Sequence, residues 1–194
     1  MVLSKNASNP VLRKEFKEKA DQRKVLIQEY FWNDSLGIFT DYIFNKGKST
    51  NVISAAGLFP LYFGTATEEQ AKKTVATFTK HLLKPGGVVT SVNNTGQQWD
   101  APNGWAPLQW MCVKGLDRYG YKDMAKEVAS RWVKLNEKVY KSQTKFVEKY
   151  NVEDLSLEAG GGEYPVQDGF GWSNGVYVAL KAYLEKSKSA RNNE

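Results

Sequence analysis

The sequence predicts an all-α fold of about six helices, joined by long loops rich in Gly and Trp. Apolar residues recur at helical spacing in several segments, whereas only residues 88–92 have strong β-propensity. A lone short strand cannot form a sheet. The chain has 194 residues, of which 41% are hydrophobic and 25% charged, as is typical of one globular domain. We therefore expect a single domain over residues 1–194, with basic, flexible ends at about residues 1–8 and 187–194.

The first predicted helix covers residues 9–32, where charged residues surround an apolar face. That face is formed by Leu12, Phe16, Ala20, Ile27 and Phe31. Residues 33–37 break the helix, and residues 38–42 are expected to be extended or irregular. A short apolar helix follows over residues 52–63, with Pro60 as a kink or boundary.

Thr67 and the acidic residues after it predict an N-cap and the first turn of a further helix. Lys84-Pro85-Gly86-Gly87 ends that helix, because Pro and Gly interrupt helical backbone. Three more helices are predicted over about residues 103–120, 122–150 and 172–186.

The net charge of +6 is confined to the two ends of the chain. Residues 1–24 carry four more basic than acidic side chains, residues 181–194 carry two more, and residues 25–180 are balanced. A basic groove for nucleic acid is therefore not expected. No window approaches ~18 consecutive apolar residues, so no membrane span is expected.

The chain has one cysteine, Cys112, and one histidine, His81. One cysteine cannot form an internal disulfide, and the two residues together are too few for a structural zinc site. We expect neither a metal nor an organic cofactor. The first residues lack the apolar stretch of a secretion signal. With a single cysteine, this favours the cytoplasm as the location.

Two loops, residues 97–105 and 160–172, concentrate aromatic residues beside carboxylates and amides. A sugar ring stacks its apolar C–H faces on aromatic rings and bonds its hydroxyls to planar polar groups. Carbohydrate is therefore the expected ligand class. The alternative is that the tryptophans are core anchors and the glycines are turns; these tryptophans are Trp99, Trp105, Trp110 and Trp172.

Both segments resemble the α,α-trehalases, glycoside hydrolases that split trehalose into two glucose molecules. Residues 98–107, QWDAPNGWAP, are similar to one family signature. Residues 160–176, GGGEYPVQDGFGWSNGV, are similar to the glycine-rich block near the end of the family's catalytic domain. The similarity begins at about Tyr30 and so covers nearly the whole chain.

The resemblance implies a partial (α/α)6 toroid with a pocket at one end. The family signature of the form Pro-Gly-Gly-Arg-Phe-x-Glu is absent from the sequence, as is the block that supplies the catalytic aspartate. The chain therefore resembles the C-terminal portion of a trehalase, and we expect it to associate with itself or with the missing N-terminal half of the toroid.

Family trehalases invert the anomeric configuration, which requires a general acid and a general base ~6.5–9.5 Å apart. The resemblance implies that Glu148, in Val147-Glu148-Lys149-Tyr150, is the general base and that Glu163 binds the sugar. From its residue pattern alone, Glu148 would be a solvated helix residue. The acid is not expected in this chain, so we expect little turnover by the chain alone.

The motifs supply further candidate substrate-binding residues, which are Trp99, Asp100, Asn103, Trp105, Gln167 and Trp172. Asn103 has an equal alternative as the N-cap of the next helix. The expected partner is trehalose. The alternatives are a non-catalytic sugar-binding or regulatory protein, and a toroid glycosidase with another substrate.

Overall fold

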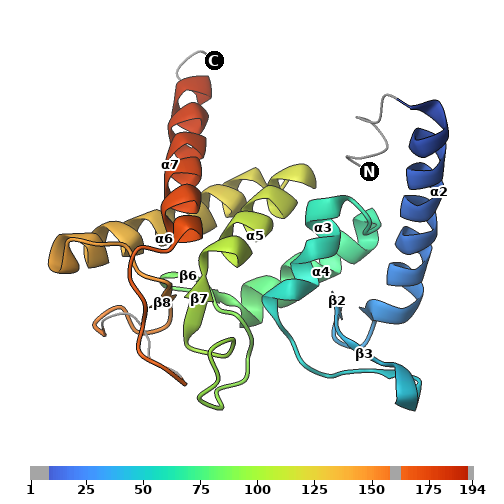
Figure 1. Ribbon diagram of the computed structural model, residues 1–194, viewed down its shortest axis with the longest axis horizontal. Coiled ribbons are helices and arrows are strands. Elements are labelled where there is room, and N and C mark those ends of the chain that lie inside the picture. The colour runs from blue at the N-terminus through green and yellow to red at the C-terminus, as the bar shows by residue number, and fades with distance from the viewer. Residues whose placement is uncertain (1–8, 158–162, 192–194) are drawn as a thin grey trace.

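The computed structural model describes residues 9–157 and 163–191, and within them the chain is mainly helical (Figure 1). The six α-helices of this part are α2 (Pro10–Leu26), α3 (Phe59–Phe63), α4 (Glu68–His81), α5 (Ala106–Arg118), α6 (Lys122–Gln143) and α7 (Gly171–Arg191). Three short segments have other helical geometries: η1 (Ile27–Phe31) is a π-helix, and η2 (Phe44–Lys46) and η3 (Ala55–Leu58) are 3₁₀ turns.

The strands are two or three residues long and pair into antiparallel ribbons. These pairs are β1 (Trp32–Asn33) with β2 (Ile38–Phe39), β3 (Tyr42–Ile43) with β4 (Lys48–Ser49), β5 (Leu83–Lys84) with β6 (Gly87–Val88), and β7 (Asn103–Trp105) with β8 (Lys149–Asn151). Because each ribbon has only two strands, the helices provide the framework of the fold.

The core surrounds α5, which packs against α3, α6 and α7. Cys112 and Leu116 of α5 and Trp132 of α6 have no exposed surface. Gly115 lets α3 approach closely, since a Cβ at this position would lie 3.0 Å from the backbone nitrogen of Tyr62. The three long C-terminal helices, α5, α6 and α7, thus form one packed unit above the loops around β7 and β8 (Figure 1).

Helix α4 begins as predicted with a capping box. The Thr67 hydroxyl accepts a hydrogen bond from the Gln70 backbone N–H at 3.1 Å, and the Gln70 side chain accepts one from Thr67 N–H at 2.9 Å. The helix ends at His81, before the β5–β6 turn. The Gln109 amide of α5 then fixes β6 by bonding both the N–H and the carbonyl of Val88, at 2.8 and 2.7 Å.

The helix predicted over residues 52–63 is α-helical only from Phe59, after the 3₁₀ turn η3. Two other predicted helix boundaries are wrong, and both of these errors involve the β7–β8 ribbon. Residues 103–105 form β7 rather than the start of a helix, so Asn103 is not an N-cap and α5 begins at Ala106. Helix α6 ends at Gln143 instead of near Tyr150, because Thr144 adopts a left-handed conformation with φ 58°. Pairing between distant segments outweighs the local helical pattern here.

Helix α2 lies at the edge of the molecule, on the side away from α6 and α7 (Figure 1). None of its residues is buried, and its apolar side chains Val11, Leu12, Val25 and Leu26 are exposed. A helix with an apolar face normally buries that face against another element.

Within the described residues, no helix is long and apolar enough to cross a membrane.

Cys112 is expected to resist thiol reagents until the chain unfolds. Its side chain is fully buried in α5, and this burial raises the pKa of the thiol far above its ordinary value, so the reactive thiolate is suppressed. Labelling with a disulfide reagent should be negligible in buffer and complete in denaturant. Stoichiometric labelling of the native chain within minutes would contradict the packing of α5.

Candidate functional site

The two aromatic loops and the predicted general base meet at the β7–β8 ribbon. Trp105 of β7 lies opposite Lys149 of β8 in the strand register. Glu148 precedes β8, and its backbone N–H donates to the carbonyl of Gln167 at 2.9 Å. An isolated antiparallel bridge joins Val147 to Asp168. Segments separated by up to about sixty residues are therefore side by side here.

Glu148 is buried, with only 3% of its surface exposed. Its carboxylate has two partners: Oε2 lies 3.0 Å from Lys149 Nζ, and Oε1 accepts a hydrogen bond from the Tyr164 hydroxyl at 2.9 Å. This bond to Glu148 raises the pKa of Tyr164, because the neighbouring carboxylate disfavours a phenolate. The solvated helical position suggested by the residue pattern alone is not observed, since Glu148 is buried at a bend between the Val147 bridge and β8.

The backbone on either side of Glu148 is fixed by the start of α7. The Ser173 hydroxyl donates to the carbonyl of Val147 at 2.7 Å, and the indole N–H of Trp172 donates to the carbonyl of Glu148 at 3.4 Å. Ser173 is fully buried. Glu148 is consequently held through its carboxylate by Lys149 of β8 and Tyr164 of the loop before α7, and through its backbone by α7.

Three tryptophans form an aromatic cluster beside this carboxylate. The rings of Trp99 and Trp105 stack at 4.2 Å with an interplanar angle of 4°, and Trp172 meets Trp105 edge-on at 5.7 Å. Trp105 is 1% exposed and its indole N–H donates to the Gln98 carbonyl at 3.0 Å, so it is a core anchor. Trp99 is 48% exposed and presents an aromatic surface to solvent.

Asp100 and Asn103 bond to their own loop. Asp100 accepts hydrogen bonds from the Ser91 hydroxyl at 2.9 Å and the Thr95 hydroxyl at 2.5 Å, and these bonds, led by that from Thr95, hold the pKa of its carboxyl below the ordinary range. Asn103 is buried in β7 and donates to the Gln98 carbonyl at 3.2 Å. Both side chains therefore shape the loop that carries Trp99.

Glu163 and Gln167 are exposed on the irregular segment that leads into α7. Glu163 directly precedes Tyr164, the residue bonded to Glu148. Asp168 forms an ion pair with Lys145 at 2.8 Å, which joins this segment to the end of α6. Gly160, Gly161 and Gly162 of the predicted glycine-rich block lie outside the described residues.

Sequence reasoning missed two residues of this cluster, Lys149 and Tyr164. Lys149 has no exposed surface, and its ammonium lies 4.6 Å from the centroid of the Tyr164 ring and 5.6 Å from that of Trp105. A signal was present, because Lys149 lies between the apolar residues Val147 and Val152, and a lysine that is buried among such residues requires a buried anion. Its sequence neighbour Glu148 is that anion.

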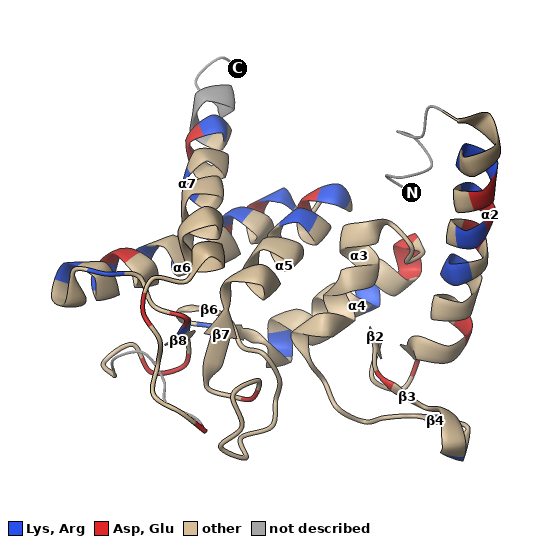
Figure 2. Cartoon of the chain, viewed as in Figure 1, with Lys and Arg blue, Asp and Glu red and all other residues tan. Residues whose placement is uncertain are grey.

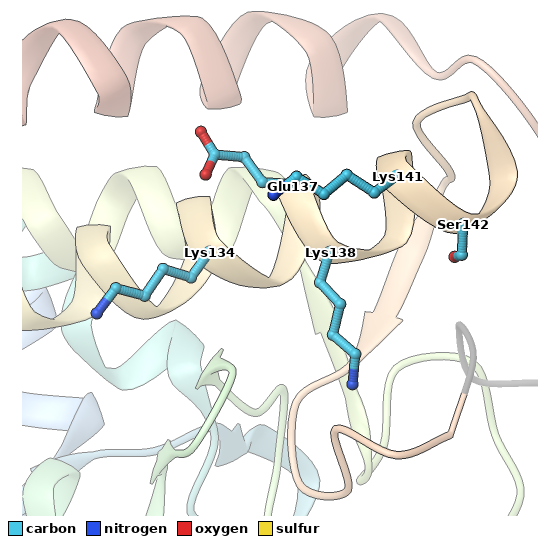
Figure 3. A pocket seen from close by; sticks show the side chains of 5 residues that line it. All are labelled: Lys134, Glu137, Lys138, Lys141 and Ser142. Carbon is cyan, nitrogen blue, oxygen red and sulfur yellow. The ribbon is translucent and has the colours of Figure 1, made fainter.

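Two hollows of the described chain lie away from this cluster and lack this combination of groups. One of about 510 Å³ opens on α6 and is lined by Lys134, Glu137, Lys138, Lys141 and Ser142 (Figure 3). Glu137 is already bonded to Tyr177 and Lys181 of α7. In residues 9–157 and 163–191, His, Cys, Asp and Glu form no group of three that could hold a metal ion.

Basic side chains lie mainly on the outer helices. Figure 2 shows Lys and Arg along α2, α6 and α7, whereas the loops below β7 carry few of them. An aromatic surface that carries carboxylates and few cations suits an uncharged, hydroxyl-rich ligand better than a polyanion.

Comparison with known proteins matches both the sequence and the fold. A family model described as Trehalase matches residues 1–184. The chain is 43% identical over 177 residues to the putative periplasmic trehalase of Escherichia coli O157:H7, a match that covers 91% of this chain and 32% of that protein. The periplasmic trehalase of E. coli K12 (strain DH10B) matches equally, with 31% of its length covered. The chain thus spans about a third of the length of these relatives.

Among solved structures, neutral trehalase Nth1 from Saccharomyces cerevisiae superposes with a TM-score of 0.74 at 34% identity, over 86% of this chain and 30% of that one. A GH63 mannosylglycerate hydrolase from Thermus thermophilus shares the fold, with a TM-score of 0.67 and 20% identity over 87% of this chain and 39% of that one. These matches confirm the predicted fold class, an all-α part of a helical toroid.

Proposed function

The chain belongs to the trehalase family, and from this membership we propose that it is the general-base part of a glycoside hydrolase that converts α,α-trehalose into two glucose molecules. The observation that carries the proposal is the buried Glu148 carboxylate, held by Lys149 and Tyr164 beside the tryptophan cluster. A carboxylate placed this way has an oriented lone pair for a water molecule.

In the proposed reaction, Glu148 removes a proton from water as the water oxygen attacks the anomeric carbon. A new C–O bond forms on the face opposite the glycosidic bond, the glycosidic bond breaks, and the leaving oxygen takes a proton from a general acid. The family resemblance assigns that acid to an aspartate upstream of the region this chain represents. No metal or organic cofactor enters these steps.

We propose that trehalose contacts the aromatic cluster and the segment before α7. The exposed ring of Trp99, stacked on Trp105, offers a flat face for the apolar side of a glucose ring, and Trp172 borders it. Glu163 and Gln167 supply hydrogen-bonding groups that face solvent next to Tyr164. Asp100 and Asn103 support this surface by fixing the loop, as their bonds to Ser91 and Gln98 indicate.

We also propose that the chain docks with the rest of a trehalase-type toroid. Its relatives are about three times as long, and α2 exposes the apolar side chains of Val11, Leu12, Val25 and Leu26. An exposed apolar surface of this kind marks an interface. Between the two expected occupants, a second copy and the missing N-terminal half, the lengths of the relatives favour the latter.

The expectation of a cytoplasmic location is wrong. The relatives that match 91% of this chain are named periplasmic trehalases, so the comparison indicates the periplasm. The features that suggested the cytoplasm, the first residues and the single cysteine, carry no information about a compartment when a chain spans a third of its relatives.

Glucose release from trehalose tests the proposed function. We expect almost none from the chain alone, and release when it is mixed with the part of the E. coli periplasmic trehalase that lies outside its match to this chain. Titration calorimetry with trehalose separates the alternative, because a non-catalytic sugar-binding protein would bind trehalose in this mixture without releasing glucose. Hydrolysis of other glucosides in preference to trehalose would contradict the proposed substrate.

A further inference from the structure

Glu148, Lys149 and Tyr164 form a closed triangle of contacts. Lys149 Nζ lies 3.0 Å from Oε2 of Glu148, the Tyr164 hydroxyl lies 2.9 Å from Oε1, and the ammonium stands 4.6 Å from the centroid of the Tyr164 ring. Each member therefore contacts the other two. Both carboxylate oxygens are engaged by different side chains, which fixes the rotation of the carboxylate plane.

Burying the Glu148–Lys149 ion pair costs free energy, because both charges lose hydration. Tyr164 offsets part of this cost by contacting both charged groups. Glu148 is 3% exposed and Lys149 is 0% exposed, so both charges have lost most of their hydration. Removing one charge of such a pair leaves the other uncompensated in a medium of low dielectric constant. The faces of Tyr164 and Trp105 provide further stabilisation of the ammonium through cation–π contacts.

The triangle also connects the separate parts of the candidate site. Lys149 lies in β8 opposite Trp105, the central ring of the tryptophan cluster. Tyr164 directly follows Glu163 on the segment before α7, and its side chain is half-exposed. A shift of that segment would move the Tyr164 hydroxyl away from Oε1, whereas Lys149, fixed in the ribbon, would keep its hold on Oε2.

We propose that Lys149 and Tyr164 are positioning residues for the Glu148 carboxylate, Lys149 fixing Oε2 within the ribbon and Tyr164 orienting Oε1 toward the substrate from the segment that carries Glu163. A carboxylate oxygen has two lone pairs, so Oε1 accepts from Tyr164 and retains one acceptor site for the attacking water. This inference rests on the proposed function for its catalytic meaning, but the contact itself is testable without turnover.

The first experiment uses the chain alone and observes Tyr164 by NMR of ¹³Cζ-labelled tyrosine at neutral pH. Its resonance is the one missing from Tyr164→Phe. We expect that resonance to move in Glu148→Gln and to stay in place in Glu153→Gln, a matched change at a carboxylate that pairs with Lys84 instead. A Tyr164 resonance that is unmoved by Glu148→Gln would overturn the inference, whether or not the protein hydrolyses trehalose.

The second experiment measures glucose release by the mixture described above. Tyr164→Phe removes one hydroxyl and is expected to lower kcat about tenfold with KM within twofold, because a misaligned base affects the chemical step more than binding. Lys149→Met is expected to lower kcat at least as much. A kcat within twofold of the original for both variants would overturn the positioning role. A wild-type mixture that releases no glucose while the Tyr164 resonance moves as expected would count against the proposed function only, and the contact would stand.

Discussion

Glu148→Gln is expected to lower glucose release from trehalose by about 10²–10⁴-fold in the mixture of this chain with the missing part of a trehalase, the range typical of losing one general base. Glutamine has nearly the same shape as glutamate but cannot take a proton from water. The loss should fall on kcat, because substrate contacts with the aromatic cluster are unchanged. Initial rates over a range of trehalose concentrations give kcat and KM separately.

The control for this result is Glu153→Gln. Glu153 follows β8, is half-buried and pairs with Lys84 at 2.9 Å, so it tests the loss of a nearby carboxylate without touching the Glu148 cluster. Its activity should stay within about twofold of the original. Circular dichroism confirms that each variant is folded, which matters because Glu148→Gln leaves the buried Lys149 without a counter-ion. A Glu148→Gln rate within tenfold of the original would refute the assignment of the general base.

Helices with strong local signals were predictable from the sequence, and the β7–β8 ribbon was not. The capping box at Thr67 and the breaker at residues 84–87 are local features, and α4 begins and ends accordingly. The ribbon depends on backbone hydrogen bonds between residues 103–105 and 149–151, which no local pattern reports. Since Asn103 and Tyr150 each continued an apparent helical pattern, periodicity extended two helices into residues that pair as strands.

The motifs indicated which residues belong to the candidate site, but they did not indicate the burial or the contacts of those residues. The resemblance drew attention to Glu148, which its residue pattern placed in solvent; its burial follows from the ribbon and from Ser173 of α7. Trp99 and Trp105 occur in one motif, so the motif does not distinguish them. Packing alone makes Trp105 a buried core anchor and leaves Trp99 exposed. The contacts of Lys149 and Tyr164 with Glu148 depend on burial and on the packing of the segment before α7 against the ribbon, which the motifs do not report.

Trp105→Ala is expected to destabilise the chain by about 3–5 kcal/mol, as is usual when a buried aromatic side chain is truncated to alanine. Trp105 is 1% exposed and joins Trp99, Trp172 and the ammonium of Lys149. Its loss removes this packing and leaves the Gln98 carbonyl without the indole donor. Urea unfolding followed by circular dichroism measures the change, which corresponds to a fall in Tm of roughly 6–20 °C for a chain of this size.

Trp99→Ala is the matched control, because Trp99 stacks on the same ring yet is half-exposed. We expect it to cost about half as much as Trp105→Ala, since about half of the Trp99 surface stays in water. A similar loss of stability in both variants would mean that Trp105 contributes no more to stability than its exposed neighbour and is not the anchor of the cluster. A large loss only in Trp105→Ala would show that β7 holds the ribbon, and with it Lys149 and Glu148, through this one side chain.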